Sequence, residues 1–133
     1  MSKMRAKILI IEDFEKVRQS YVDLLTHEEY DILEARQGEE ALKIIKNQRP
    51  DLILLDLLLP EVDGFEILAK LRADRQMRQI PVLVLSALNG EAHIQKILSS
   101  GAVDYVVKGS HSPEELILKI RKLLKKIKPV PGG

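Results

Sequence analysis

Three acidic residues, one serine and one lysine stand at the ends of short apolar runs in this 133-residue sequence. The acids are Glu12, Asp13 and Asp56, and the other two residues are Ser86 and Lys108. Carboxylates that lie close together repel one another, and a hard divalent cation with oxygen ligands, such as Mg²⁺, relieves that repulsion. A carboxylate beside Mg²⁺ is a competent nucleophile for phosphorus, and transfer then needs groups that neutralise the phosphoryl oxygens. The ammonium of Lys108 and the hydroxyl of Ser86 are groups of that type.

These five residues can act together only if the runs before them are neighbouring strands. Most of the runs lack an alternation of polar and apolar residues, and strands that are apolar on both faces are typical of parallel sheets covered on both sides. The lengths of the runs and the flanking Gly, Pro and Asp residues favour strands over buried helical pieces. We predict strands at residues 8–11, 32–33, 52–55, 82–85 and 106–107.

The stretches between the runs have the period of a helix. The last one is the clearest, because Ser112 as N-cap, Pro113 at the first helical position and Glu115 form a capping box. Its apolar stripe consists of Leu116, Ile120, Leu123, Leu124 and Ile127. In the first helical stretch, the apolar residues share one face; they are Phe14, Val17, Tyr21, Leu24 and Leu25.

Strand and helix therefore alternate five times. This order predicts an α/β fold, a flavodoxin-like doubly wound five-stranded parallel sheet of strand order 2-1-3-4-5 with five helices. All strands of such a sheet end at one edge, and the first and third are neighbours at the topological switch point. We therefore expect the three acids to share one crevice, with the serine and the lysine on the same edge. The domain is predicted to span residues 1–128, and residues 129–133 are interpreted as a tail or the start of a linker.

The composition limits the classes of function. The chain is 45% hydrophobic and 31% charged with a formal net charge of +1, which fits one globular core and indicates no general affinity for nucleic acid. The absence of cysteine excludes a disulfide scaffold, a thiolate metal site and a cysteine nucleophile. No apolar run approaches the roughly 20 residues that span a bilayer, so we expect a cytoplasmic protein without a membrane anchor. The last helix carries a row of lysines, which we interpret as its solvated face and not as a nucleic-acid site. These residues are Lys119, Lys122, Lys125, Lys126 and Lys128.

With these features, the sequence closely resembles the receiver domain of two-component response regulators over about residues 7–128. The resemblance rests on the segment at residues 52–64, with an apolar run, Asp56, Pro60 and Asp63 before a glycine. The pair Glu12-Asp13, the pair Ser86-Ala87 and the segment at residues 105–108 stand at matching spacings.

The resemblance implies a role for each site residue. Asp56 would be the phosphoacceptor, and Mg²⁺ would be bound by Asp56, by Asp13, by Glu12 through water and by the backbone carbonyl of Leu58. Lys108 would contact the phosphate, Ser86 would be the switch hydroxyl and Tyr105 the switch aromatic. A histidine kinase or phosphotransfer protein would donate the phosphoryl group. The face made by the fourth helix, fifth strand and fifth helix would signal to a downstream protein or effector domain, and a homodimer could form there. Phosphotransfer and dephosphorylation would be self-catalysed, without a conventional enzyme activity.

The sequence departs from the family pattern in two places. Gly109 follows Lys108 where the family usually has a proline joined by a cis bond, and a cis bond without proline costs about 2.5–4 kcal/mol. We predict a trans bond or a reshaped loop, and a Lys108 that is held less tightly. Leu58 and Leu88 occupy positions that often carry polar side chains near the attacking water, so we predict slow intrinsic dephosphorylation.

Other interpretations compete with this one. The chain could be a degenerate, phosphorylation-independent interaction module, a reading that only Gly109 favours. A haloacid-dehalogenase-type phosphatase needs a second Asp two residues after the first, where this chain has Leu58, and a flavodoxin needs a Ser/Thr-rich phosphate loop after the first strand. Tyr105 could be ordinary half-buried packing. The residues His27, His93 and His111 lack metal spacing and are expected to be surface residues.

Overall fold

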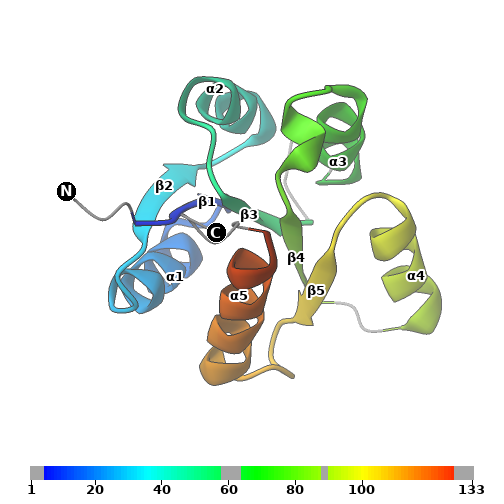
Figure 1. The fold of residues 1–133 in the computed structure, drawn as a ribbon. Coiled ribbons are helices and arrows are strands. Elements are labelled where there is room, and N and C mark those ends of the chain that lie inside the picture. Colours follow the sequence, from blue (N-terminus) through cyan, green and yellow to red (C-terminus); the bar gives the residue numbers. More distant parts are fainter. Residues whose placement is uncertain (1–4, 58–63, 88–89, 128–133) are drawn as a thin grey trace.

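The computed structural model describes residues 5–57, 64–87 and 90–127. Five parallel strands form one sheet in the order β2-β1-β3-β4-β5 (Figure 1), as the alternation of elements predicted. The strands are β1 (Lys7–Ile11), β2 (Asp31–Ala35), β3 (Leu52–Asp56), β4 (Val82–Ser86) and β5 (Asp104–Val107). The second and fifth strands are longer than predicted because their outer residues, on edge strands, are less apolar.

Helices cover both faces of the sheet. The described helices are α1 (Glu15–Thr26), α2 (Gly38–Gln48), α3 (Gly64–Ala73), α4 (Glu91–Ser99), α5 (Pro113–Ile127) and a short 3₁₀ helix, η1 (Met77–Gln79). Figure 1 shows α1 and α5 on one face, and α2 and α3 on the other. Within the described part of the chain, no helix combines the length and the apolar character that crossing a bilayer requires.

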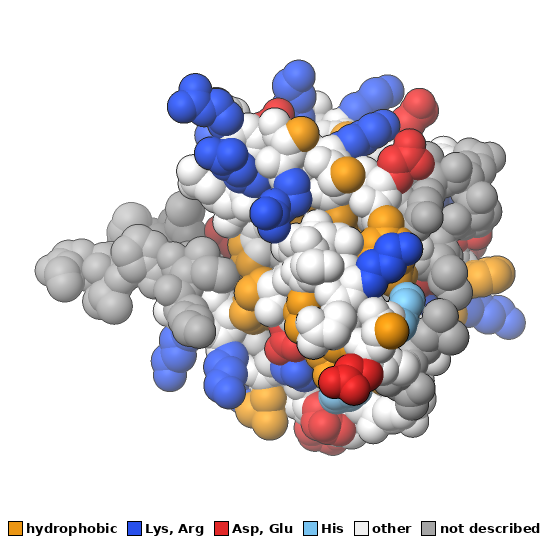
Figure 2. Space-filling view, turned by 90° about the vertical axis from the view of Figure 1, so that its right-hand side faces the viewer, with side chains coloured by type: hydrophobic (Ala, Val, Ile, Leu, Met, Phe, Trp, Pro, Cys, Tyr) orange, Lys and Arg blue, Asp and Glu red, His pale blue; other side chains and the backbone are white. Residues whose placement is uncertain are grey.

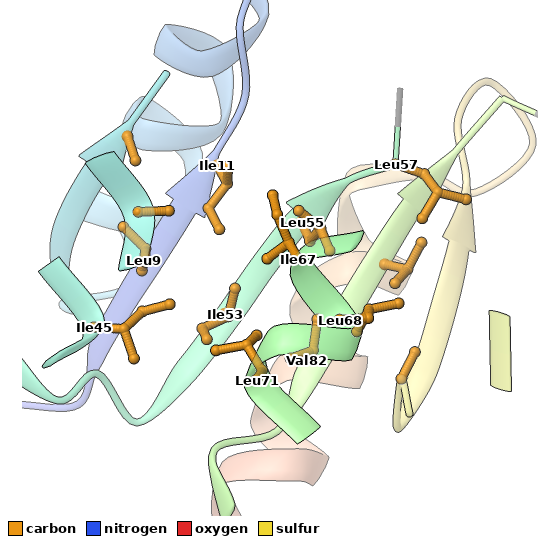
Figure 3. Packing of buried hydrophobic residues seen from close by; sticks show 14 of the residues in the cluster. Leu9, Ile11, Ile45, Ile53, Leu55, Leu57, Ile67, Leu68, Leu71 and Val82 are labelled. Carbon is orange, nitrogen blue, oxygen red and sulfur yellow. The ribbon is translucent and has the colours of Figure 1, made fainter. Parts of the chain in front are cut away.

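Two apolar cores hold the layers together, one on each face. Along β3 the side chains alternate between them, so that Ile53 and Leu55 enter the core under α2 and α3, whereas Leu52 and Leu54 enter the core under α1 and α5. Figure 3 shows the first of these cores, where Ile67 of α3 packs over β3. A strand buried on both faces explains why its sequence is apolar without alternation.

The start of α5 has the predicted capping box. The amide of Ser112 donates to Oε1 of Glu115 (2.9 Å), and the amide of Glu115 donates to Oγ of Ser112 (3.2 Å). The hydrogen bond from the Ser112 amide lowers the pKa of Glu115 below its ordinary value. The predicted stripe is buried at Leu116, Ile120, Leu123 and Leu124.

The predicted buried face of α1 is wrong at Phe14. This residue precedes the helix with extended backbone (φ −75°, ψ 120°), and its side chain is 68% exposed. Its amide donates to Oε2 of Glu12 (3.3 Å), so Phe14 belongs to the strand-to-helix turn. Because the helical repeat begins only at Glu15, Phe14 does not share the face of Leu25, which is fully buried.

Candidate functional site

The carboxyl ends of four strands bring predicted site residues together. Asp56 ends β3, Glu12 follows β1, and Lys108 follows β5. The Nζ atom of Lys108 lies 2.9 Å from Oδ2 of Asp56 and 3.5 Å from Oε1 of Glu12. Ser86 ends β4, and its carbonyl accepts a hydrogen bond from the amide of Lys108 (2.7 Å). The crevice therefore contains two carboxylates and one ammonium in direct contact, with the serine beside them.

Burial makes the electrostatics of this crevice strong. Glu12 is fully buried, and Asp56 and Ser86 are 4% and 3% exposed. Burial, followed by contact with the Asp56 carboxyl, raises the pKa of Glu12 to about 7 against the opposing effects of Lys108 and of the Phe14 amide. Partial burial acts to lower the pKa of Lys108, but Asp56 and Glu12 outweigh it, so this pKa lies above its ordinary value. Lys108 is therefore held as a cation.

The raised pKa of Glu12 predicts how stability depends on pH. Glu12 keeps its proton to about pH 7 in the folded protein, whereas the ordinary value is 4.5. The folded state thus binds more protons between these values, and the free energy of unfolding should fall as pH rises from about 4.5 to about 7. Urea unfolding in EDTA across this range measures it. In Glu12→Gln the decline should be smaller, and in the control Glu39→Gln, at an exposed position, it should persist; equal slopes in all three proteins would contradict the prediction.

The residues present fit Mg²⁺, which binds one or two carboxylates and completes its coordination with water and other oxygens. Oε1 of Glu12 is buried and has no hydrogen-bond partner among the described residues, so a bound cation or one of its waters would satisfy this oxygen. Asp13, the next residue in the chain, is half-buried. No three acidic or histidine side chains in the described ranges could enclose a metal ion by themselves. Leu58, whose carbonyl is a predicted ligand, lies outside these ranges.

Arg18 is a site residue that the sequence reasoning missed. Its side chain is buried on α1, where Nη1 donates to the carbonyl of Glu12 (3.0 Å) and Nε pairs with Oε1 of Glu34 on β2 (2.9 Å). Arg18 thus fixes the backbone from which Glu12 points into the crevice. A lone arginine inside an amphipathic stretch is usually exposed, so the sequence carried no signal for this role.

Removing Arg18 should destabilise the protein. Arg18→Ala leaves the buried carbonyl of Glu12 unpaired, which costs about 1–3 kcal/mol in the free energy of unfolding. The control is Arg121→Ala, because Arg121 makes an exposed pair with Glu28 that is worth at most about 1 kcal/mol. Urea unfolding of both variants measures the difference, and an equal loss in the two would contradict a special role for Arg18.

Two of the three histidines lie at the site. Nε2 of His93 on α4 is 3.0 Å from Oγ of Ser86. Nδ1 of His111 is 2.9 Å from the amide nitrogen of Val107, and its ring meets Tyr105 edge-on with centroids 6.4 Å apart. Both histidines are half-buried, so the prediction of surface residues is wrong for them and right only for the exposed His27. The spacing of histidines along the chain bears on metal binding and carries no information about neighbours that helix docking creates.

The loop after Lys108 differs from the family pattern as predicted. No peptide bond within the described ranges is cis, so Lys108 and Gly109 are joined by a trans bond. Gly109 has φ +85°, a conformation that favours glycine, although an added Cβ would meet no atom within 4 Å. Lys108 was expected to be held less tightly than in other members of the family. Its contacts give no sign of this, because both its amide and its Nζ are hydrogen-bonded.

Tyr105 lies on β5 and is half-buried. Nζ of Lys119 is 5.7 Å from the centroid of its ring, and the ring packs against the core under α2 and α3. This placement fits both interpretations of the residue, a switch aromatic and ordinary packing, so its role stays a prediction.

Fold and site together define a class of protein, the flavodoxin-like α/β domains with an acidic crevice at the switch point of the sheet. The family model of the response regulator receiver domain matches residues 8–121. The chain belongs to the response regulator receiver domain family, which its motifs had predicted.

Curated relatives are similar along most of the chain. It is 37% identical over 123 residues to the "Probable transcriptional regulator ycf27" of Porphyridium aerugineum, covering 92% of this chain and 50% of that protein. It is 41% identical over 101 residues to the transcriptional regulatory protein AfsQ1 of Streptomyces coelicolor, covering 76% and 44%. The chain thus spans about half the length of the curated relatives it matches.

Solved structures agree on the fold. The receiver domain of the Francisella response regulator 1452 has a TM-score of 0.87 and 32% identity, with 93% of this chain and 100% of that chain covered. The Vibrio cholerae chemotaxis protein CheY4 has a TM-score of 0.83 and 28% identity, with 90% and 99% covered.

Proposed function

We propose that this receiver domain is a phosphorylation switch that accepts a phosphoryl group on Asp56. The observation that carries the proposal is the contact of Lys108 with Asp56, 2.9 Å between Nζ and Oδ2, beside the buried Glu12. An ion pair at the end of a buried strand combines a nucleophilic carboxylate with a cation ready to contact the incoming phosphoryl oxygens. The degenerate interaction module would not require this constellation.

In the proposed reaction a carboxylate oxygen of Asp56 attacks the phosphorus of a phosphohistidine. An acyl-phosphate bond forms, the phosphorus–nitrogen bond breaks, and the departing imidazole takes up a proton. Lys108 neutralises one phosphoryl oxygen and the hydroxyl of Ser86 donates to another. Bound Mg²⁺, held by Asp13, Asp56 and, through water, Glu12, would supply further charge neutralisation of the phosphoryl group.

The proposed partners follow from the family. A histidine kinase or phosphotransfer protein would donate the phosphoryl group, and a downstream protein or effector domain would respond. The relatives named as transcriptional regulators are about twice as long as the matched region, which supports an effector of that kind. We place this function in the cytoplasm as part of the proposal.

The proposed signalling face is the one that α4, β5 and α5 make. It carries three exposed apolar residues, Leu98, Val103 and Leu118, of which Leu118 is 59% exposed. Figure 2, seen from the side where α4 lies, shows hydrophobic side chains at the surface below a group of lysines and arginines. Apolar residues on a surface of this kind suit protein contacts, including a homodimer.

Intact mass spectrometry after incubation with acetyl phosphate and Mg²⁺ tests the proposal. The wild-type protein should gain the mass of one phosphoryl group, and Asp56→Asn should gain none. Omission of Mg²⁺ should also prevent the gain. No gain in the wild-type protein under forcing conditions would favour the interaction module instead.

A further inference from the structure

The hydroxyl of Ser86 has a partner that the proposed chemistry does not use. Oγ of Ser86 lies 3.0 Å from Nε2 of His93, in the first turn of α4. The side chain of Ser86 is 3% exposed, and its backbone is fixed because its carbonyl accepts the amide of Lys108. Only a rotation about the Cα–Cβ bond of Ser86 can therefore carry the hydroxyl elsewhere without moving the strand.

The imidazole of His93 is itself held in place. It meets the ring of Phe65 on α3 edge-on, with centroids 6.3 Å apart and an interplanar angle of 87°. Nζ of Lys96, one turn further along α4, lies 4.3 Å from the centroid of the same Phe65 ring. These contacts tie His93 to the packing between α3 and α4, so the imidazole cannot follow a rotating Ser86 without disturbing that packing.

Asp56 and His93 belong to different elements that flank Ser86. Asp56 is on β3, which pairs with one side of β4, whereas His93 is on α4, which packs against β5 on the other side. We therefore expect a rotation that takes Oγ toward Asp56 to take it away from Nε2. The hydrogen bond is lost in that movement whether the hydroxyl or the imidazole supplies the proton.

We propose that His93 is a positioning residue that holds the Ser86 hydroxyl in the resting protein, and that phosphorylation of Asp56 exchanges this hydrogen bond for one to the phosphoryl group. The inference rests on the proposed function. Its consequence is that His93 opposes the active arrangement, and that release of the Ser86–His93 bond loosens the start of α4 from the end of β4. This connects the phosphorylation site with a helix of the proposed signalling face.

The test uses beryllium trifluoride with Mg²⁺, an anion that mimics a phosphoryl group on an aspartate. The concentration that gives half conversion to the adduct is measured by NMR for the wild-type protein, His93→Ala and His93→Gln. His93→Ala should need about two- to tenfold less of the anion, the range expected for the loss of one neutral hydrogen bond. His93→Gln, which keeps a side-chain hydrogen-bonding group, should lie between the two. His27→Ala, at an exposed histidine, is the control and should match the wild-type protein.

A second measurement reads the hydrogen bond directly and needs no adduct. The ring ¹⁵N shifts of His93 should differ between the wild-type protein and Ser86→Ala, and adduct formation in the wild-type protein should move them toward the Ser86→Ala values. Identical His93 shifts in the resting wild-type and Ser86→Ala proteins would overturn this inference but leave the proposed function standing. So would an unchanged or raised half-conversion concentration in His93→Ala. Absence of any adduct on wild-type Asp56 would instead overturn the proposed function and, with it, the inference.

Discussion

Replacing Gly64 with alanine should destabilise the folded protein by about 3 kcal/mol or more, the upper end of the range for overpacking. A Cβ on this residue would stand 2.7 Å from both Cα and the carbonyl oxygen of Leu57 and 3.0 Å from its carbonyl carbon. These are backbone atoms and cannot rotate aside. Leu57 is also fixed, because its amide donates to the carbonyl of Leu85 (3.2 Å) and its carbonyl accepts the amide of Gly64 (3.0 Å).

The strain should also reach the candidate site, because Leu57 directly follows Asp56. Gly64→Ala should therefore slow the Mg²⁺-dependent gain of a phosphoryl group as well as lower the free energy of unfolding in urea. The matched control is Gly90→Ala, since Gly90 has φ −67° and a Cβ there would meet no atom within 4 Å. Equal free energies of unfolding in the two variants would show that the close approach of Gly64 to Leu57 does not determine stability.

The fold could be predicted because one simple pattern determines it. Strand β3 is buried on both faces, and such a strand needs apolar residues at every position, so its sequence signals a covered parallel sheet. The rule that parallel strands end at one edge then places Glu12, Asp56 and Lys108 together without any knowledge of side-chain contacts. The capping box of Ser112 was equally predictable, since all its members lie within one helical turn.

The residues that the sequence did not disclose owe their roles to docking between elements. His93 meets Ser86 only because α4 packs beside the end of β4, and no spacing in the chain encodes that angle. Arg18 is buried because the turn after β1 presents the carbonyl of Glu12 to it. The close approach of Gly64 to Leu57 likewise depends on how α3 leaves the sheet. Local patterns thus determine which elements form, whereas tertiary packing determines which polar side chains acquire partners.

The phosphorylated protein should lose its phosphoryl group slowly at neutral pH, and Leu58→Asn should speed that loss by about tenfold or more. Hydrolysis requires a water to attack the phosphorus while the bond to the Asp56 oxygen breaks, which returns the carboxylate and releases inorganic phosphate. The resemblance to the family predicts that Leu58 and Leu88, which lie outside the described residues, border the attacking water, and apolar side chains cannot hydrogen-bond this water or orient it. A misplaced reacting group can cost about 10²-fold in rate, so a side chain that orients the water should have a large effect.

The decay of the phosphorylated mass after removal of acetyl phosphate, with Mg²⁺ retained and no phosphatase present, measures this rate. Leu118→Asn is the matched control, because it makes the same change at an exposed position on α5 and should decay as the wild-type protein does. Leu88→Asn should act in the same direction as Leu58→Asn if both side chains border the water. Rapid decay of the wild-type protein would contradict the prediction, because it would mean that the attacking water is oriented without help from the side chains at positions 58 and 88.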